Sequence, residues 1–148
     1  MRLASGGGGK EGGEVCVWDV ERGGQLSQFL GHPGSVFALA WGAGEEILIT
    51  GSSDGRLRWW DVQRWECLFV CEAHQGVVQS LRRSPDGMRL ASCGDDGAIR
   101  LWDLSSGEHL RTLRRDRPYE RLNITGIKGL TEAQKATLRA LGAVEDRS

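Results

Sequence analysis

The stretch that decides the fold is Leu57-Arg58-Trp59-Trp60-Asp61-Val62, a short apolar run that ends in Trp-Asp. Similar stretches stand at residues 15–20 and 98–104, so the pattern occurs three times. Their tryptophans, Trp18, Trp60 and Trp102, are 42 residues apart in both intervals. Self-similarity at one fixed period of this length indicates a repeat architecture, in which each repeat is one supersecondary unit.

Composition excludes several classes of protein. The 148 residues include 19 Lys and Arg against 20 Asp and Glu, which gives no overall attraction to nucleic acid or to an anionic membrane. No window approaches the ~20 apolar residues of a membrane span, and the N-terminus lacks the apolar run of a signal peptide. The four cysteines form no C-x-x-C pair. We therefore expect a cytoplasmic protein with no membrane partner, no metal and no cofactor.

The two central repeats, residues 23–64 and 65–106, each predict four short strands. In the first of them the expected strands are 25–30, 35–41, 46–50 and 56–61. The Asp54-Gly55 dipeptide between the last two supplies the positive φ angles of a tight hairpin turn. Residues 65–106 copy this register. Four strands in about 42 residues, with regular turn signals, is an all-β pattern.

Residues 1–22 are expected to form an incomplete first unit of two strands joined by the glycine-rich segment 6–13. The Gly-Lys pair in this segment resembles part of a phosphate-binding loop. Lys10 is followed by Glu11 rather than by Ser or Thr, and a strand follows rather than a helix. Both points argue against a nucleotide site.

Residues 107–148 differ from the repeats. They predict an outer strand over 108–113, one more short strand over 122–127 and a helix over 132–141. Thr131 and Gln134 form a capping box at the start of this helix, and Gly142 can end it. The segment 111–121, which includes the end of the outer strand, holds five arginines and two acids. We interpret this segment as a solvated edge; a patch for an anionic partner is the alternative.

The repeats resemble those of the WD-repeat family, the four-stranded blades of β-propellers. The expected fold is all-β: a partial β-propeller of two full four-stranded blades plus a half blade, with a short C-terminal helix. In that family a polar tetrad of His, Ser or Thr, Asp and Trp links the strands inside each blade. The matching residues here, displaced by 42 positions, are His32, Thr50, Asp54 and Trp60, and His74, Ser92, Asp96 and Trp102.

The hydrogen-bonding chemistry of these four residue types explains such a tetrad independently of the resemblance. A buried indole N–H needs an acceptor, a hydroxyl can accept it, and a neutral histidine can join the hydroxyl to a carboxylate. Ser92, His74 and Asp96 also have the residue types of a nucleophilic triad. The set occurs twice, however, and the other copy carries Thr50. We therefore expect a structural role and no enzymatic activity.

The resemblance implies a scaffold that binds a protein or peptide. The near-neutral charge and the lack of interleaved aromatic residues in segment 111–121 argue against a nucleic-acid partner. The implied contact positions flank the inner strand and the hairpin Asp of each repeat. Phe37 is the best anchor among them if it is exposed. The positions are Ser35, Phe37 and Ser53 in one repeat, and Val77, Gln79 and Asp95 in the next. The alternative is a small-ligand-binding or hydrolytic β protein that uses the glycine-rich segment and the His, Ser and Asp residues.

Two blades and a half cannot close a ring, since propellers need about four to eight blades. Residues 117–126 and 130–134 resemble the closing segment of large bacterial WD-repeat proteins, in which the tail would cap the last blade. We expect the chain to be the C-terminal part of such a regulatory or signalling protein. Open blade edges also predict self-association.

One pair of positions breaks the pattern. Arg82 and Arg83 stand where the preceding repeat has Ala40 and Trp41. Each arginine must either extend to solvent or find a carboxylate.

Overall fold

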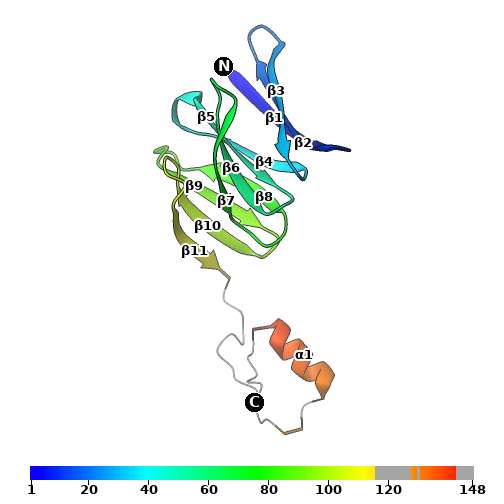
Figure 1. The fold of residues 1–148 in the computed structure, drawn as a ribbon. Helices are drawn as coiled ribbons and strands as arrows, with labels where there is room; N and C mark the ends of the chain where they lie inside the picture. The colour runs from blue at the N-terminus through cyan, green and yellow to red at the C-terminus, as the bar shows by residue number, and fades with distance from the viewer. Residues whose placement is uncertain (116–127, 130, 143–148) are drawn as a thin grey trace. The chain divides into compact units, whose positions relative to one another are not determined.

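A computed structural model describes residues 1–115, 128–129 and 131–142. The chain divides into two compact units, Met1–Arg114 and Arg115–Ser148. The first unit consists of three antiparallel sheets (Figure 1), which confirms the predicted all-β fold with blade-like sheets. Their strands are β1 (Arg2–Gly9), β2 (Gly12–Asp19) and β3 (Gly24–His32); β4 (Val36–Trp41), β5 (Ile47–Ser52), β6 (Arg56–Asp61) and β7 (Glu66–Glu72); and β8 (Val78–Arg83), β9 (Arg89–Gly94), β10 (Ala98–Asp103) and β11 (His109–Arg114).

The sheets are offset from the sequence repeats by one strand. β3 lies in the repeat that begins at residue 23, yet it pairs with β2 of the first sheet. In the same way β7 completes the second sheet and β11 the third. The first sheet therefore has three strands rather than the two expected, and the outer strand predicted over 108–113 completes the third sheet as β11.

The aspartate of each Trp-Asp pair explains this offset. Asp19 Oδ1 accepts hydrogen bonds from the backbone amides of Glu21 and Arg22, and Gly23 then takes a positive φ of 70°. This tight turn sends β3 back along β2. Asp61 and Asp103 accept the equivalent amides in the other two sheets. The sequence pattern did not show this role, because it places the turns but not the partner of each strand.

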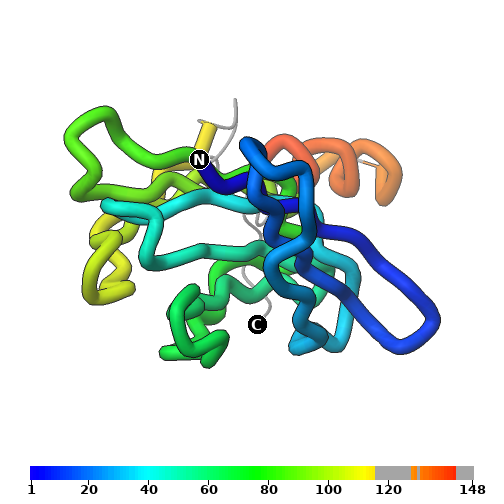
Figure 2. The backbone as a smooth tube through the Cα atoms, turned by 90° about the horizontal axis from the view of Figure 1, so that it is seen from above, coloured from blue at the N-terminus to red at the C-terminus, as the bar shows by residue number. Residues whose placement is uncertain are grey.

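The sequence predicted a loop in the glycine-rich segment, but the structure shows that most of it is strand. β1 and β2 continue through the glycines to a two-residue tip at Lys10 and Glu11, which projects from the rest of the backbone (Figure 2). Close packing explains the glycines, since a Cβ on Gly6 would lie 2.6 Å from Val36 Cγ1. A Cβ on Gly51 would meet Val78 Cγ1 at 2.5 Å, which is the same contact one sheet later.

Two apolar clusters hold the three sheets together. The first lies between the first and second sheets and includes Val15, Val17, Val36, Leu48 and Trp60. The second lies between the second and third sheets. Its buried members are Ala38, Ile49, Leu57, Trp59, Ala73, Val78, Leu81, Leu90, Trp102 and Leu104. Each cluster joins a sheet to the next one, as expected for repeat units that cannot bury their faces alone.

The second unit contains α1 (Glu132–Ala140), which confirms the predicted C-terminal helix. Thr131 accepts a hydrogen bond from the Gln134 amide and Gln134 reaches back to the Thr131 amide, as the capping box requires. Gly142 follows with a φ of 104°. The predicted strand over 122–127, the tail segment 117–126 and the basic segment beyond residue 115 lie outside the described residues.

Candidate functional site

The third sheet holds a complete polar tetrad. Trp102 Nε1 donates to Ser92 Oγ at 3.0 Å, and Ser92 Oγ lies 2.8 Å from His74 Nε2. His74 Nδ1 lies 2.9 Å from Asp96 Oδ1. A carboxylate only accepts, so in the neutral ring Nδ1 carries the proton and Nε2 accepts the serine hydroxyl. Hydrogen bonds therefore run in one direction, from tryptophan through serine and histidine to aspartate.

The second sheet begins its tetrad in the same way. Trp60 Nε1 donates to Thr50 Oγ1 at 2.9 Å, and Thr50 Oγ1 lies 2.8 Å from His32 Nε2. The expected link from His32 to Asp54 is wrong, however. Arg58 stands between them, with NH1 3.0 Å from His32 Nδ1 and NH2 2.7 Å from Asp54 Oδ2. The tetrad of this sheet has become a chain of five side chains.

The insertion of Arg58 places the proton of His32 on the opposite ring nitrogen from that of His74. A guanidinium only donates, so Nδ1 of His32 accepts and Nε2 carries the proton that Thr50 receives. Burial and, next, the Arg58 charge lower the pKa of His32 to about 4, although the Asp54 charge opposes them. Burial would raise the pKa of Asp54, but the hydrogen bond from Arg58 keeps it below its ordinary value. The two sheets therefore satisfy the same residue types with opposite histidine tautomers.

The position of Arg58 explains why only one sheet shows the insertion. Arg58 is 6% exposed and lies on β6, two residues before Trp60. Its equivalent on β10, Arg100, is partly exposed and only approaches Asp96 Oδ2, at 3.4 Å. The pKa of Asp96 falls to about 2, because hydrogen bonds from His74 and two backbone amides outweigh the effect of burial. The sequence shows arginine in both places and could not show which one is buried.

The first sheet keeps only the end of this network. Trp18 Nε1 donates to Ser5 Oγ at 3.0 Å, in an exposed setting. Cys16 occupies the position of Arg58 and Arg100. His32 ends β3 of the first sheet and His74 follows β7 of the second, so each histidine reaches its network from the preceding sheet. The network of the first sheet has no such histidine among the described residues.

Comparison with known proteins fits these repeated networks. The family model described as "WD domain, G-beta repeat" matches residues 23–61 and again residues 65–103, which is more than half of the chain. The chain belongs to the WD-repeat family. A segment of 35 residues is 57% identical to part of an uncharacterized WD repeat-containing protein from Nostoc sp. (strain PCC 7120). The match covers 24% of this chain and only 2% of that much longer relative.

Membership of the WD-repeat family makes the chain a protein-interaction scaffold by type, in a family whose members generally are not enzymes. The geometry of the third tetrad agrees with that description. Ser92 is 1% exposed, and its hydroxyl is held between Trp102 and His74. A nucleophile must reach a substrate with its oxygen. The Ser92 hydroxyl is instead committed to the interior of its sheet.

Trp59 is a structural residue of the WD repeat that the sequence pattern did not single out. Its side chain is fully buried between the second and third sheets, where it stacks on Phe69 with ring centroids 4.8 Å apart. Its Nε1 donates to the Leu104 carbonyl at 2.9 Å. The available signal was strand alternation, since neighbours on a strand face opposite sides. Trp60 faces the first sheet, so Trp59 must face the third.

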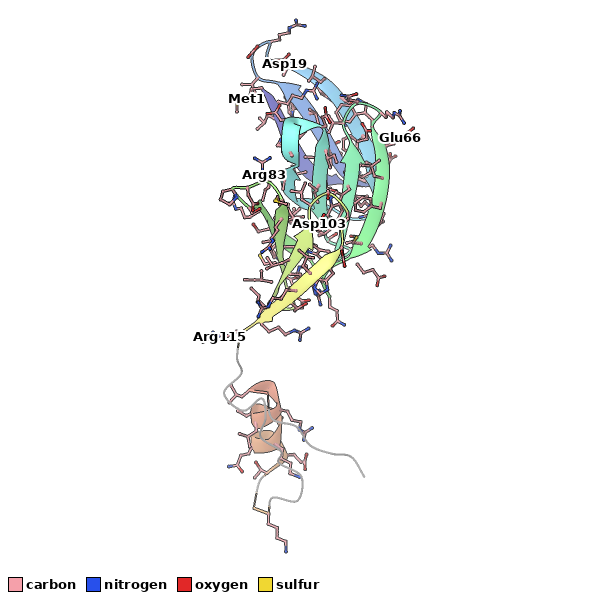
Figure 3. All side chains as sticks on the ribbon, turned by 90° about the vertical axis from the view of Figure 1, so that its left-hand side faces the viewer. Met1, Asp19, Glu66, Arg83, Asp103 and Arg115 are labelled. Atoms are coloured by element: carbon pink, nitrogen blue, oxygen red, sulfur yellow. The ribbon has the colours of Figure 1, made fainter. Side chains whose placement is uncertain are left out.

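The two arginines that break the repeat pattern are accommodated at the surface. Arg82 and Arg83 are both exposed. Arg83, labelled in Figure 3, donates from NH1 to the Gly42 carbonyl of the second sheet at 3.0 Å. The Gly42 carbonyl thus satisfies the Arg83 guanidinium beside the second sheet, and the side chain does not have to be buried.

The candidate contact positions form two equivalent groups. Phe37 is 57% exposed and is the extra residue of a β-bulge, because Val36 pairs with Ser52 while Ala38 pairs with Gly51. Bulges turn a side chain away from its ordinary direction. The backbone amide of Ser53 bonds the Ser35 carbonyl beside it, at 2.9 Å. The second group lies in the third sheet and consists of Val77, Gln79 and Asp95.

In the second group Gln79 is the bulged residue. Its Nε2 donates to Asp95 Oδ1 at 2.6 Å, and the amide of Val77 donates to Asp95 Oδ2 at 3.3 Å. These polar groups are satisfied by one another. Of the two bulges, the one at Phe37 presents the large apolar side chain.

Proposed function

We propose that this WD-repeat chain binds a protein or peptide partner at the bulge of the second sheet, with Phe37 as the anchor. The observation that carries the proposal is the exposure of this one aromatic ring at a bulge. Exposed aromatic side chains contribute disproportionately to binding when a partner covers them. The flanking Ser35 and Ser53 can supply hydrogen bonds at the rim of the contact, and the polar group of Gln79 and Asp95 can extend it.

A pull-down with the full chain as bait tests this proposal, comparing wild type with Phe37→Ala. Leu30→Ala is the matched control, because Leu30 is also a large exposed apolar residue but lies on the outer strand β3. We expect Phe37→Ala to lose the partner and Leu30→Ala to keep it. Equal recovery with both variants would remove Phe37 from the binding site. Phe37→Trp should preserve binding, since an aromatic anchor is retained.

We further propose that the chain acts within a larger bacterial regulatory or signalling protein of the cytoplasm. The support is the relative, of which the matched segment is only 2%. No helix in the described residues is long and apolar enough to cross a membrane. Genomic sequence upstream of the Met1 codon tests the proposal: further in-frame repeats of the same period would support it, and an unrelated upstream gene would contradict it.

The first sheet also supports the proposal that copies of the chain self-associate. β4 and β8 are the first strands of the second and third sheets, and no strand within the described ranges lies in that place beside β1. A free strand edge is a template for pairing with another chain. Light scattering should then show a mass that rises with protein concentration. A monomer that persists at high concentration would refute this pairing.

A further inference from the structure

The third sheet has one face turned away from the second sheet, and arginines mark its two sides. Strand pairing places one row across all four strands of this sheet: Arg82 opposite Ala91, Ala91 opposite Leu101, and Leu101 opposite Arg111. Residues directly opposite one another in an antiparallel pair share a face. Arg89 lies on the same face, two residues before Ala91. We call this surface the arginine face; its members are Arg82, Arg89, Ala91, Ile99, Leu101, Arg111 and Leu113.

The second sheet provides an internal reference for this face. Its row 42 residues earlier is Ala40, Ile49, Trp59 and Phe69, all apolar. Ile49 and Trp59 are fully buried there, because the third sheet packs on them. The third sheet has thus replaced both ends of an apolar stacking row with arginine. Arg89 replaces a third apolar residue, Ile47.

The centre of the arginine face remains apolar. Ile99 and Leu113 are paired across β10 and β11 and are 44% and 41% exposed. The guanidinium groups of Arg82, Arg89 and Arg111 are exposed and form no ion pair with any residue that the structure describes. An apolar centre with charged groups at its rim is the usual anatomy of a protein-binding surface.

We propose that the arginine face binds an acidic protein segment, with apolar side chains over Ile99 and Leu113 and carboxylates opposite the arginines. Covering a guanidinium without a carboxylate costs several kcal/mol, so the partner has to supply the negative charge. Arginine and carboxylate also match in a bidentate geometry, which fixes the orientation of the partner.

A second copy of the chain and the chain's own C-terminal tail are two possible occupants of the arginine face, and both fit it poorly. If a second copy continued the stack, its first sheet would present Leu3 and Val20. These residues occupy the repeat positions of Leu90 and Leu104, which face the second sheet. Apolar groups of this kind leave the arginines uncompensated. The tail is also unsuitable in charge, since residues 115–148 contain seven Lys or Arg against five Asp or Glu.

A nucleic acid would satisfy the arginines through its phosphates but not the centre of the face. Single strands bind through bases stacked on aromatic rings, and the arginine face as defined contains no aromatic residue. An acidic protein segment meets both requirements, which is why we favour it. This surface is separate from the Phe37 bulge, so a partner at one site does not require the other.

Fluorescence anisotropy with the full chain tests the proposal, using three labelled probes. They are a peptide of about eight residues that alternates glutamate with leucine, the same peptide with lysine for glutamate, and a single-stranded oligothymidine of similar length. We expect the glutamate peptide to bind, with an affinity that falls as salt is added. The lysine peptide and the oligothymidine should bind at least about tenfold more weakly, a difference of about 1.4 kcal/mol.

Variants assign the binding to this face. Arg82→Glu combined with Arg111→Glu should weaken the glutamate peptide at least about tenfold, and Ile99→Ser should also weaken it. Arg22→Glu combined with Arg64→Glu is the charge-matched control, since both arginines are exposed in turns outside this face and should leave binding unchanged. All these positions are exposed, and circular dichroism checks that each variant is folded.

Three results would overturn the proposal: no binding of the glutamate peptide, equal binding by the double variant, or tighter binding of the oligothymidine through the same arginines. Loss of the Phe37-dependent partner in the double variant would show that the two surfaces are one site. Retention of that partner would keep the arginine face as a separate site. Failure of either proposal can therefore be distinguished from failure of the other.

Discussion

Removing the Asp54 carboxylate tests the arginine inserted into the second tetrad. The Arg58 side chain is 7% exposed and its NH2 lies 2.7 Å from Asp54 Oδ2. Asp54→Ala would leave a guanidinium charge buried with only the neutral His32 ring beside it. Breaking one side of a buried ion pair costs about 3–5 kcal/mol. We expect a loss of that size in the free energy of unfolding, measured by urea denaturation at pH 7.

The double variant Asp54→Ala with Arg58→Met makes this prediction specific. It removes both charges, and an apolar replacement of a buried ion pair is often close to neutral. The double variant should therefore be more stable than Asp54→Ala alone, by about 2 kcal/mol or more. Asp96→Ala in the third sheet should cost less, about 1–3 kcal/mol, since the partly exposed Arg100 stays hydrated. A double variant no more stable than Asp54→Ala would refute the buried pairing.

Three further predictions concern single positions. The pKa of His32, lowered to about 4, lies below its unfolded value near 6.5, so the unfolded chain binds more protons between those values. Stability should fall by about 1–3 kcal/mol as the pH drops from 6.5 to 4, and urea titrations of His32→Gln should lack this component; an identical pH profile would contradict it. Trp59→Phe strands the Leu104 carbonyl and leaves a void, and should lower the unfolding free energy by about 2–3 kcal/mol; a loss below about 0.5 kcal/mol would contradict that role. Gly51→Ala places a Cβ 2.5 Å from Val78 Cγ1 and should lower the unfolding free energy by about 1–3 kcal/mol in the same assay. An unchanged denaturation midpoint would show that the second and third sheets can move apart to accept the methyl group.

The fold could be predicted because its signals are local and repeated. Hairpin turns such as Asp54-Gly55 set the strand boundaries, and the 42-residue period fixed the equivalence of every tetrad member. The capping box at Thr131 predicted the helix start for the same reason. What failed was the assignment of strands to sheets. A period shows which residues are equivalent, but not whether β3 folds back on β2 or forward onto β4.

The site was less predictable, because it depends on burial. Arg58 and Arg100 have the same repeat position, and each lies on the side of its sheet that faces the preceding sheet, yet only Arg58 is buried. The glycine-rich segment shows the same limit: its composition is typical of a loop, and only the distance from Gly6 to Val36 reveals why a strand needs glycine there. Contacts between sheets are long-range, and no local pattern contains them.

The differences among the three sheets indicate where function lies in this chain. One bond is common to the three sheets: in each, a tryptophan donates to a hydroxyl, at 2.9–3.0 Å. Other equivalent positions differ, since they hold Phe37 and Gln79 at one bulge, and Phe69 and Arg111 on one stacking row. A repeat that served only as structure would have no physical reason to expose an aromatic ring in one copy and free guanidinium groups in another. Recognition by WD-repeat sheets of this chain should therefore follow the positions at which equivalent residues differ, and exchanging Phe37 with Gln79 should move the partner's contact from the second sheet to the third.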